Sequence, residues 1–151
     1  MTQAHDIYQD FLDTASVALW NRDYITVAAM LSYPHLIRLP ETDRIIQNAA
    51  EQQLDAQAFR ESLKGLGATA YHRLCRDAQF DPDGPDRITG AHTTYIMRGG
   101  SYLTDPYECR MSLMRQSDGR WLADAINVSV RKSGMAYYHP DNIRARTGRP
   151  K

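Results

Sequence analysis

The second half of the chain holds four strand-like segments in succession: ATAYHRLCRDAQF (68–80), RITGAHTTYIMR (87–98), YECRMSLMRQS (107–117) and RWLADAINVSV (120–130). Apolar and polar residues alternate along each segment, which is typical of a half-buried antiparallel strand. Between the segments, Asp, Gly and Pro gather at turn positions. The pattern therefore predicts a four-stranded meander with one buried and one exposed face.

Helical patterns dominate the residues before this meander. Apolar residues recur at a spacing of three and four over residues 7–19 and 24–31, which predicts two helices, with Asp23 placed to cap the second. A third helix begins near Asn48, where Glu51 completes a capping box, and its apolar residues continue to Leu63.

A hairpin lies between the second and the third predicted helix. Pro34 ends the helical pattern, because proline disfavours helical geometry in the residue before it. Residues 35–39 then read as a strand, and residues 40–43 as a turn into residues 44–46. The predicted order is two helices, a hairpin, a third helix and the meander.

Length and composition indicate one soluble domain. The chain has 151 residues, which is enough to bury a core without disulfides or metals. Cys75 and Cys109 belong to no ligand cluster, so we expect a reducing cytoplasm. No stretch approaches the roughly 18 apolar residues of a membrane span, and no export signal is recognised.

The formal net charge is zero, but the charges are unevenly placed. Residues 131–151 hold six Lys or Arg against Asp141 alone, and the rest of the chain is acidic. We expect residues 131–151 to form a basic, flexible, solvated tail, and we do not expect nucleic acid as a partner.

This order of elements resembles the NTF2-like superfamily, whose relatives include ketosteroid isomerase, scytalone dehydratase and the SnoaL-type polyketide cyclases. The resemblance covers residues 5–130, and its markers are the break Asn21-Arg22-Asp23, the step Leu31-Ser32-Tyr33-Pro34-His35 and the closing pattern Asp118-Gly119-Arg120-Trp121-Leu122. It implies an α+β cone in which a curved antiparallel sheet wraps around three helices from the N-terminal half. The expected organisation is one NTF2-like domain over residues 1–130, often homodimeric, followed by the basic tail.

Strand register predicts which side chains share the concave face of the sheet. A two-residue Asp-Gly turn places Met111 opposite Ile126, Cys109 opposite Val128 and Leu113 opposite Asp124. A first loop centred on Gly84 places His92 opposite Arg76 and Ile96 opposite His72. A middle loop that places His92 opposite Leu113 then completes a predicted row across the concave face, which consists of Arg76, His92, Leu113 and Asp124.

This row carries the predicted site. Asp124 is expected to act as a base and His92 as its catalytic partner, with Arg76 helping to stabilise developing oxyanion charge. The expected ligand-binding residues are Arg76, His72, Thr94, Cys109, Met111, Leu113 and Ile126. A structural alternative remains for each polar residue, because Arg76 and Asp124 can neutralise each other and a histidine on a strand is often structural. For His35 the sequence leaves two alternatives, lining the pocket or facing solvent, of which we expect the second.

The resemblance implies a protein that binds a small molecule. If the protein is an enzyme, we expect a cofactor-free isomerase, cyclase or dehydratase that acts on a small cyclic or carbonyl compound. The groups of a ketosteroid isomerase are missing, because Leu39 precedes Pro40 and Ala15 stands at the helix position of the tyrosine. No Gly-rich phosphate loop, HExxH motif or metal-ligand cluster is present, so neither a cofactor nor a metal is expected. The alternative is a non-catalytic ligand-binding or interaction module that dimerises through the outer sheet face.

Overall fold

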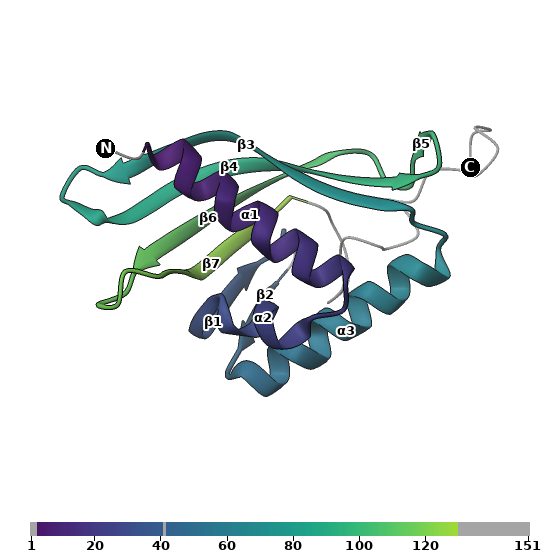
Figure 1. The fold of residues 1–151 in the computed structure, drawn as a ribbon, viewed down its shortest axis with the longest axis horizontal. Coiled ribbons are helices and arrows are strands. Elements are labelled where there is room, and N and C mark those ends of the chain that lie inside the picture. The colour runs from purple at the N-terminus through teal and green to yellow at the C-terminus, as the bar shows by residue number, and fades with distance from the viewer. Residues whose placement is uncertain (1–2, 41, 130–151) are drawn as a thin grey trace.

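We describe residues 3–40 and 42–129 of the chain in a computed structural model. They form three helices and one seven-stranded sheet (Figure 1). The helices are α1 (Ala4–Trp20), α2 (Tyr24–Ala29) and α3 (Ala49–Gly65). The strands are β1 (Leu31–Arg38), β2 (Asp43–Ile46), β3 (Ala70–Asp81), β4 (Gly84–Arg98), β5 (Ser101–Tyr102), β6 (Tyr107–Arg115) and β7 (Trp121–Val128). The predicted α+β fold is confirmed.

The sheet is curved and open, and its strand order is β2-β1-β7-β6-β4-β3, with β5 paired to β4. It is mixed rather than wholly antiparallel, because β1 lies beside β7 and runs parallel to it. In Figure 1 the long β3–β4 ribbon passes over α1, and the sheet bends through β6 and β7 to β1, beside α2 and α3. The prediction of one domain over residues 1–130 stays a prediction, and the expected tail lies outside the described residues.

Local signals set the helix ends. Asp23 caps α2, because its carboxylate accepts hydrogen bonds from the backbone N–H of Thr26 at 3.2 Å and from its hydroxyl at 2.6 Å. Asn48 caps α3 by accepting the N–H of Glu51 at 3.0 Å, and the Glu51 carboxylate accepts the N–H of Gln47 at 3.0 Å. The predicted capping box at the start of α3 is therefore present.

A β-bulge interrupts β3 at Arg76. Ala78 pairs with Gly90 and Phe80 with Ile88, but the register then shifts by one residue, so that Cys75 pairs with His92. A shift of one residue exchanges the two faces of a strand. The expected pairs of His92 with Arg76 and of Ile96 with His72 are wrong for this reason.

A second bulge lies in β7 at Asp124. The turn before β7 contains three residues, because Gln116 donates its N–H to the Arg120 carbonyl at 2.7 Å and Gly119 has a positive φ of 89°. Leu113 consequently pairs with Ala123 instead of Asp124. The bulge then restores the predicted register, so the expected pairs Met111–Ile126 and Cys109–Val128 are confirmed.

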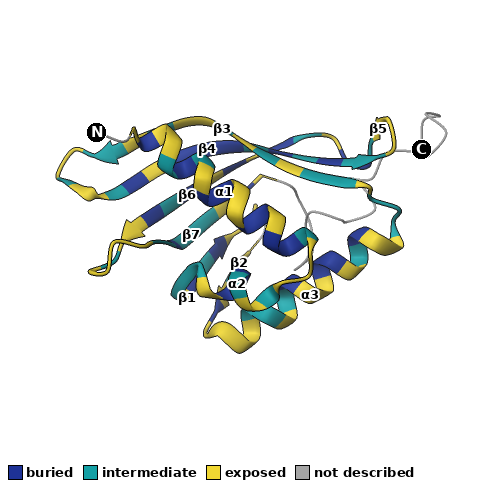
Figure 2. Cartoon of the chain, viewed as in Figure 1, coloured by how far each residue is buried: buried dark blue, intermediate teal, exposed yellow. Residues whose placement is uncertain are grey.

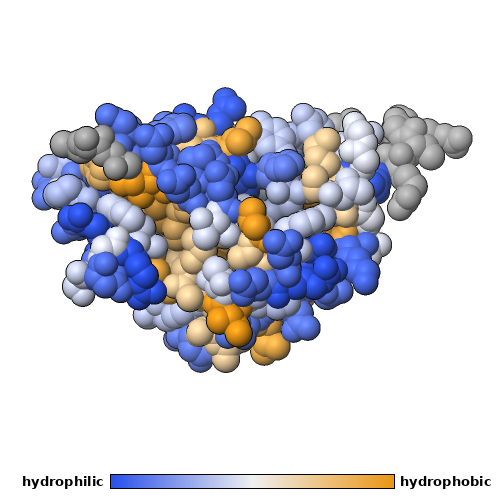
Figure 3. Space-filling model, in the orientation of Figure 1, coloured by the Kyte–Doolittle hydropathy of each residue, from blue (hydrophilic) through white to orange (hydrophobic). Residues whose placement is uncertain are grey.

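Two clusters of buried apolar side chains fill the space between the helices and the sheet. One lies around Phe59, Leu63 and Ile96, and the other around Tyr8, Leu12 and Leu113. Figure 2 shows buried residues recurring along α1, α3 and the inner strands. Figure 3 shows apolar atoms exposed in a band between α1 and the α2–β1 segment, with hydrophilic atoms on either side. None of the described helices is long and apolar enough to cross a membrane.

Candidate functional site

A cavity of about 140 Å³ lies between the helices and the concave face of the sheet. Most of its wall is apolar and comes from α1, α3 and β6, including Phe11, Ala15, Leu19, Ala56, Phe59 and Met111. An apolar cavity of about 150 Å³ in another protein accepts benzene. The space therefore suits a ligand built on one small ring.

His92 lies on the side of the cavity that the sheet forms. It is fully buried on β4, and its Nδ1 lies 2.6 Å from the hydroxyl of Tyr8 on α1. Its Nε2 is buried and has no hydrogen-bond partner within the described part of the chain. Burial, with a smaller contribution from the charge of Arg73, lowers the pKa of His92 to about 3. The imidazole is therefore neutral at pH 7.

Arg73 brings a positive charge to the same wall. It lies on β3 with Tyr71, whose ring centroid is 5.6 Å from the guanidinium carbon, and its Nε donates to Ser16 Oγ at 2.8 Å. Among the described residues no carboxylate lies within ion-pair distance of Arg73. Arg73 and Tyr71 also line a groove between α1 and β3, so they separate the cavity from the surface. A half-buried cation without a counter-ion favours a ligand that carries or develops negative charge.

His35 lies on the opposite side of the cavity. It is 4% exposed on β1, which contradicts the expectation that it faces solvent. Its Nδ1 lies 3.2 Å from the carbonyl oxygen of Ala123, which can only accept, so Nδ1 carries the proton and Nε2 a lone pair. Burial lowers the pKa of His35, and the hydrogen bond with Ala123 and the charges of Asp124 and Asp55 offset part of that effect. His35 can therefore accept a proton.

α3 adds two polar side chains near the cavity. Asp55 accepts a hydrogen bond from Arg44 Nη2 at 2.7 Å, in a pair whose two side chains are 12% and 25% exposed. Gln52 presents a buried amide oxygen that lacks a partner in the described residues. The carboxylate oxygens of Asp55, the amide oxygen of Gln52 and the lone pair of His35 Nε2 all accept hydrogen bonds. This side of the cavity therefore favours a ligand group that donates a hydrogen bond. His92 and Arg73 lie on the other side.

The structure brings together five of the predicted site residues. His92, Thr94, Cys109, Met111 and Ile126 all line the cavity. The Thr94 hydroxyl lies 3.9 Å from Cys109 Sγ, and burial raises the pKa of that thiol to about 12. These five positions follow the predicted face, because their strands keep the expected alternation.

Three other predicted site residues do not reach the cavity. His72 and Arg76 are exposed on the outer face, because the bulge at Arg76 turns the first half of β3 over. Leu113 is fully buried, but it packs in the cluster around Tyr8 and Leu12. The predicted row across the concave face is therefore wrong, although its member His92 lies where expected.

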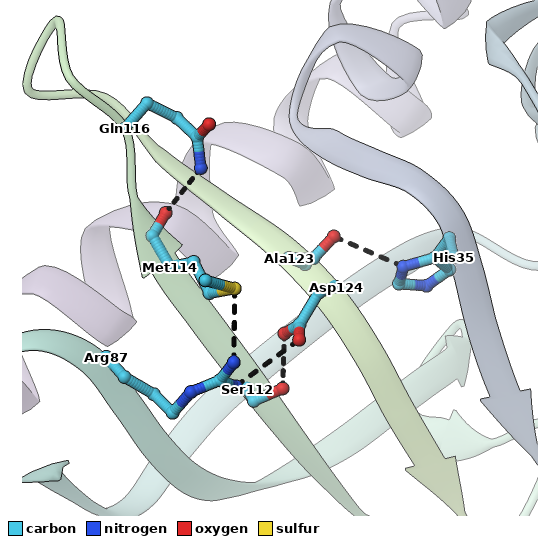
Figure 4. A network of polar contacts seen from close by, with 7 residues as sticks. All are labelled: His35, Arg87, Ser112, Met114, Gln116, Ala123 and Asp124. Atoms are coloured by element: carbon cyan, nitrogen blue, oxygen red, sulfur yellow. Dashed lines mark hydrogen bonds and ion pairs between the residues drawn. The ribbon is translucent and has the colours of Figure 1, made fainter.

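Asp124 also lies outside the cavity. Its carboxylate accepts a hydrogen bond from the Ser112 hydroxyl and pairs with Arg87 Nη1 at 3.3 Å (Figure 4). Ser112 and Arg87 belong to the outer face, and Figure 4 shows the Asp124 side chain turned toward them while His35 reaches the Ala123 carbonyl. The geometry gives no support to Asp124 as the base, because its partners hold it on the other side of the sheet.

Five residues at the site were not among the predicted site residues: Tyr8, His35, Gln52, Asp55 and Arg73. A signal existed on α3, because Gln52 and Asp55 share helical spacing with Ala56 and Phe59, two apolar residues of the predicted third helix. No comparable signal marks Arg73, since the bulge that turns it inward has no sequence signature here.

No family model matches the sequence, and no curated protein matches it. Solved structures match its fold. A domain of unknown function with a cystatin-like fold from Nostoc punctiforme superimposes with a TM-score of 0.66 at 15% identity, over 89% of this chain and 82% of that one. An NTF2-like protein with a cystatin-like fold from Novosphingobium aromaticivorans gives 0.64 at 12% identity, over 88% and 86%.

A third match is ActVI-ORFA from Streptomyces coelicolor, with a TM-score of 0.62 at 15% identity, over 82% of this chain and 94% of that one. Identities this low establish the fold and leave the activity open. The described residues of this chain have the NTF2-like fold.

Proposed function

We propose that the protein binds a small ring compound with a carbonyl oxygen in this cavity, and that it catalyses cofactor-independent proton transfer next to that carbonyl. The observation that carries the proposal is the pair of buried histidines, His35 and His92, on the wall of one apolar cavity beside Arg73, which has no ion-pair partner among the described residues. Isomerisation, cyclisation and loss of water can each begin with such a transfer.

Each polar group has one role in the proposed reaction. His35 Nε2 takes a proton from the carbon next to the carbonyl and becomes positively charged. The electron pair of the broken C–H bond forms the enolate, whose oxygen gains negative charge. His92 and Arg73 stabilise that oxygen, in a cavity where low polarity strengthens each interaction. Return of a proton to a carbon of the enolate restores neutral His35.

Hydrogen–deuterium exchange tests this step without knowledge of the natural substrate. Cyclohexanone is incubated with the protein in D₂O, and loss of the α-proton signal is followed by NMR. We expect exchange above the buffer rate, and His35→Gln should reduce the protein-dependent part at least about 100-fold, which is the usual contribution of general base catalysis. Asp86→Asn is the control, because it removes an exposed carboxylate that pairs with Arg115 and is not among the charges acting on His35, and it should leave the rate unchanged.

The assay separates binding from catalysis. If cyclohexanone binds but its protons do not exchange, the cavity is a binding site without this chemistry. If His35→Gln exchanges as fast as the unchanged protein, His35 is not the base.

A non-catalytic binding module is the second candidate. One observation favours it: the cavity carboxylate, Asp55, is held by Arg44, so the available base is a histidine whose pKa is lowered by burial. In this reading the outer sheet face forms a homodimer, since Leu74 and Met114 are 51% and 37% exposed there. Sedimentation should then show a dimer that Leu74→Glu dissociates, whereas Leu54→Glu on α3 should not.

A further inference from the structure

The buried contact between Tyr8 and His92 determines which hydrogen bond the cavity can make. Tyr8 is fully buried on α1, and His92 Nδ1 is the only hydrogen-bond partner of its hydroxyl among the residues described. Burial, the largest influence, raises the pKa of Tyr8, so the side chain remains a protonated phenol that must donate.

Only one arrangement of protons satisfies both groups. If Tyr8 donates to Nδ1, that nitrogen carries a lone pair and the ring proton lies on Nε2. If Nδ1 carried the proton instead, the phenol proton of Tyr8 would be buried without an acceptor, at a cost of about 1–3 kcal/mol. The contact therefore favours the Nε2–H form of His92.

The backbone around Gly90 holds Tyr8 in this position. A Cβ added at Gly90 would lie 2.6 Å from Cε2 and 2.8 Å from Cδ2 of Tyr8, and 2.8 Å from the carbonyl oxygen of Asp77. The absent side chain at Gly90 lets the Tyr8 ring lie directly on β4, two residues from His92. Tyr8, Gly90 and His92 thus form one packed unit behind the cavity wall.

We propose that Tyr8 is a positioning residue that fixes His92 as the Nε2–H tautomer, and that the cavity consequently selects ring ligands with an acceptor oxygen. The selection of ligands rests on the proposed function, whereas the tautomer does not. Nε2 has no partner among the described residues although its ring lines the cavity, so the ligand supplies the missing acceptor. A ring ketone of about seven heavy atoms suits a cavity close in size to one that accepts benzene.

NMR of ¹⁵N-labelled protein at pH 7 tests the tautomer directly. We expect His92 Nε2 to resonate as a protonated ring nitrogen and Nδ1 as an unprotonated one. Tyr8→Phe should shift the Nδ1 signal and reduce the Nε2–H population. Tyr33→Phe is the matched control, because it also removes a part-buried phenol hydrogen bond, that to the Ala28 carbonyl. A proton on Nδ1 in the unchanged protein, or ¹⁵N signals that Tyr8→Phe leaves unaltered, overturns the role of Tyr8.

Ligand binding tests the selection. Cyclohexanone and methylenecyclohexane have nearly the same shape, but only the ketone carries an acceptor oxygen. We expect the ketone to bind at least about 10-fold more tightly, because the hydrocarbon leaves Nε2–H unpaired. Tyr8→Phe should reduce this ratio, and Tyr33→Phe should keep it. Equal affinities in the unchanged protein overturn the selection. If neither compound binds, the ligand class and the proposed function both fail, while the NMR result still decides the role of Tyr8.

Discussion

The two sides of the cavity each present a buried neutral histidine, but different groups hold them. On the β1 side, Nδ1 of His35 bonds to a backbone carbonyl of β7, which can only accept. On the β4 side, Nδ1 of His92 bonds to the phenol of Tyr8, a side chain from α1. The hydrogen bond to the backbone therefore leaves Nε2 of His35 as an acceptor. The hydrogen bond from the Tyr8 side chain, which a substitution can remove, leaves Nε2 of His92 as a donor.

This difference teaches how one residue type supplies opposite chemistry within a single cavity. The partner of Nδ1 decides whether Nε2 accepts or donates. The two sides also differ in charge, because Asp124 and Asp55 contribute to the field at His35 and Arg73 to the field at His92. The cavity is thus polarised between a proton-accepting side and a proton-donating side.

The largest effect is expected from Gly90→Ala, a substitution on the His92 side of the cavity. In Gly90→Ala the new methyl group overlaps the Tyr8 ring and the backbone of Asp77, so we expect a loss of about 3 kcal/mol in the free energy of unfolding. Denaturant unfolding measures the loss, and Gly84→Ala is the control on the same strand, because a Cβ there meets no atom within 4 Å. Equal stabilities of the two variants would contradict the close packing of Tyr8 on β4.

The second prediction concerns how the contribution of each histidine to the free energy of unfolding depends on pH. Burial holds the folded-state pKa of His92 near 3, below the ordinary 6.5, so its contribution to stability is present above pH 6.5 and is lost as the pH falls toward 3. Between pH 7 and pH 5 this amounts to about 2 kcal/mol. His35 acts in the same direction, because burial also lowers its pKa.

Unfolding experiments at pH 7, 6 and 5 measure this dependence. His92→Gln should remove most of the slope, and His35→Gln should remove the smaller remainder. A slope unchanged by His92→Gln would show that this histidine is not buried in its neutral form.

The third prediction concerns the His35 side. Asp55→Asn removes one charge that offsets the effect of burial on His35, so the pKa of His35 should fall further. The variant also loses the ion pair with Arg44, and we expect about 1 kcal/mol lower stability. NMR titration of the two imidazoles checks the result, since the pKa of His92 should stay constant. A larger change at His92 than at His35 would contradict the proposed polarity.

The smallest expected effect lies outside the cavity. Asp124→Asn weakens a part-exposed ion pair with Arg87, so the free energy of unfolding should change by less than about 1 kcal/mol. Affinity for cyclohexanone should be the same as in the unchanged protein, which calorimetry can measure. A loss of binding would place Asp124 back at the site and remove the distinction between the two faces.

Elements that depend on local chemistry could be predicted from the sequence. Residues close together in the sequence determine the helix caps at Asp23 and Asn48 and the alternation of buried and exposed residues along β4 and β6. The helices and half of the cavity wall could therefore be predicted. His92 and Thr94 were placed correctly for this reason. The NTF2-like fold could be expected from the order of the elements.

The rest of the site depends on register, which neighbouring residues do not fix. The bulge at Arg76 brings Arg73 inward, and the three-residue turn with the bulge at Asp124 turns that carboxylate outward. Packing across the sheet, rather than a local sequence motif, determines where both bulges lie. His35 was missed because its burial depends on β1 lying parallel to β7, a pairing between distant segments.

The bulge at Arg76 also bears on how this cavity changes in evolution. Tyr71, Arg73 and Cys75 face inward only because one extra residue separates them from the second half of β3. A β3 that kept all its residues but lacked the bulge would instead bring His72 and Leu74 to the cavity and remove its positive charge. A single-codon deletion of Cys75 that kept the bulge would place Leu74 opposite His92 and His72 opposite Thr94. It would thereby exchange a stripe of the ligand-facing surface, a change that otherwise requires several separate substitutions.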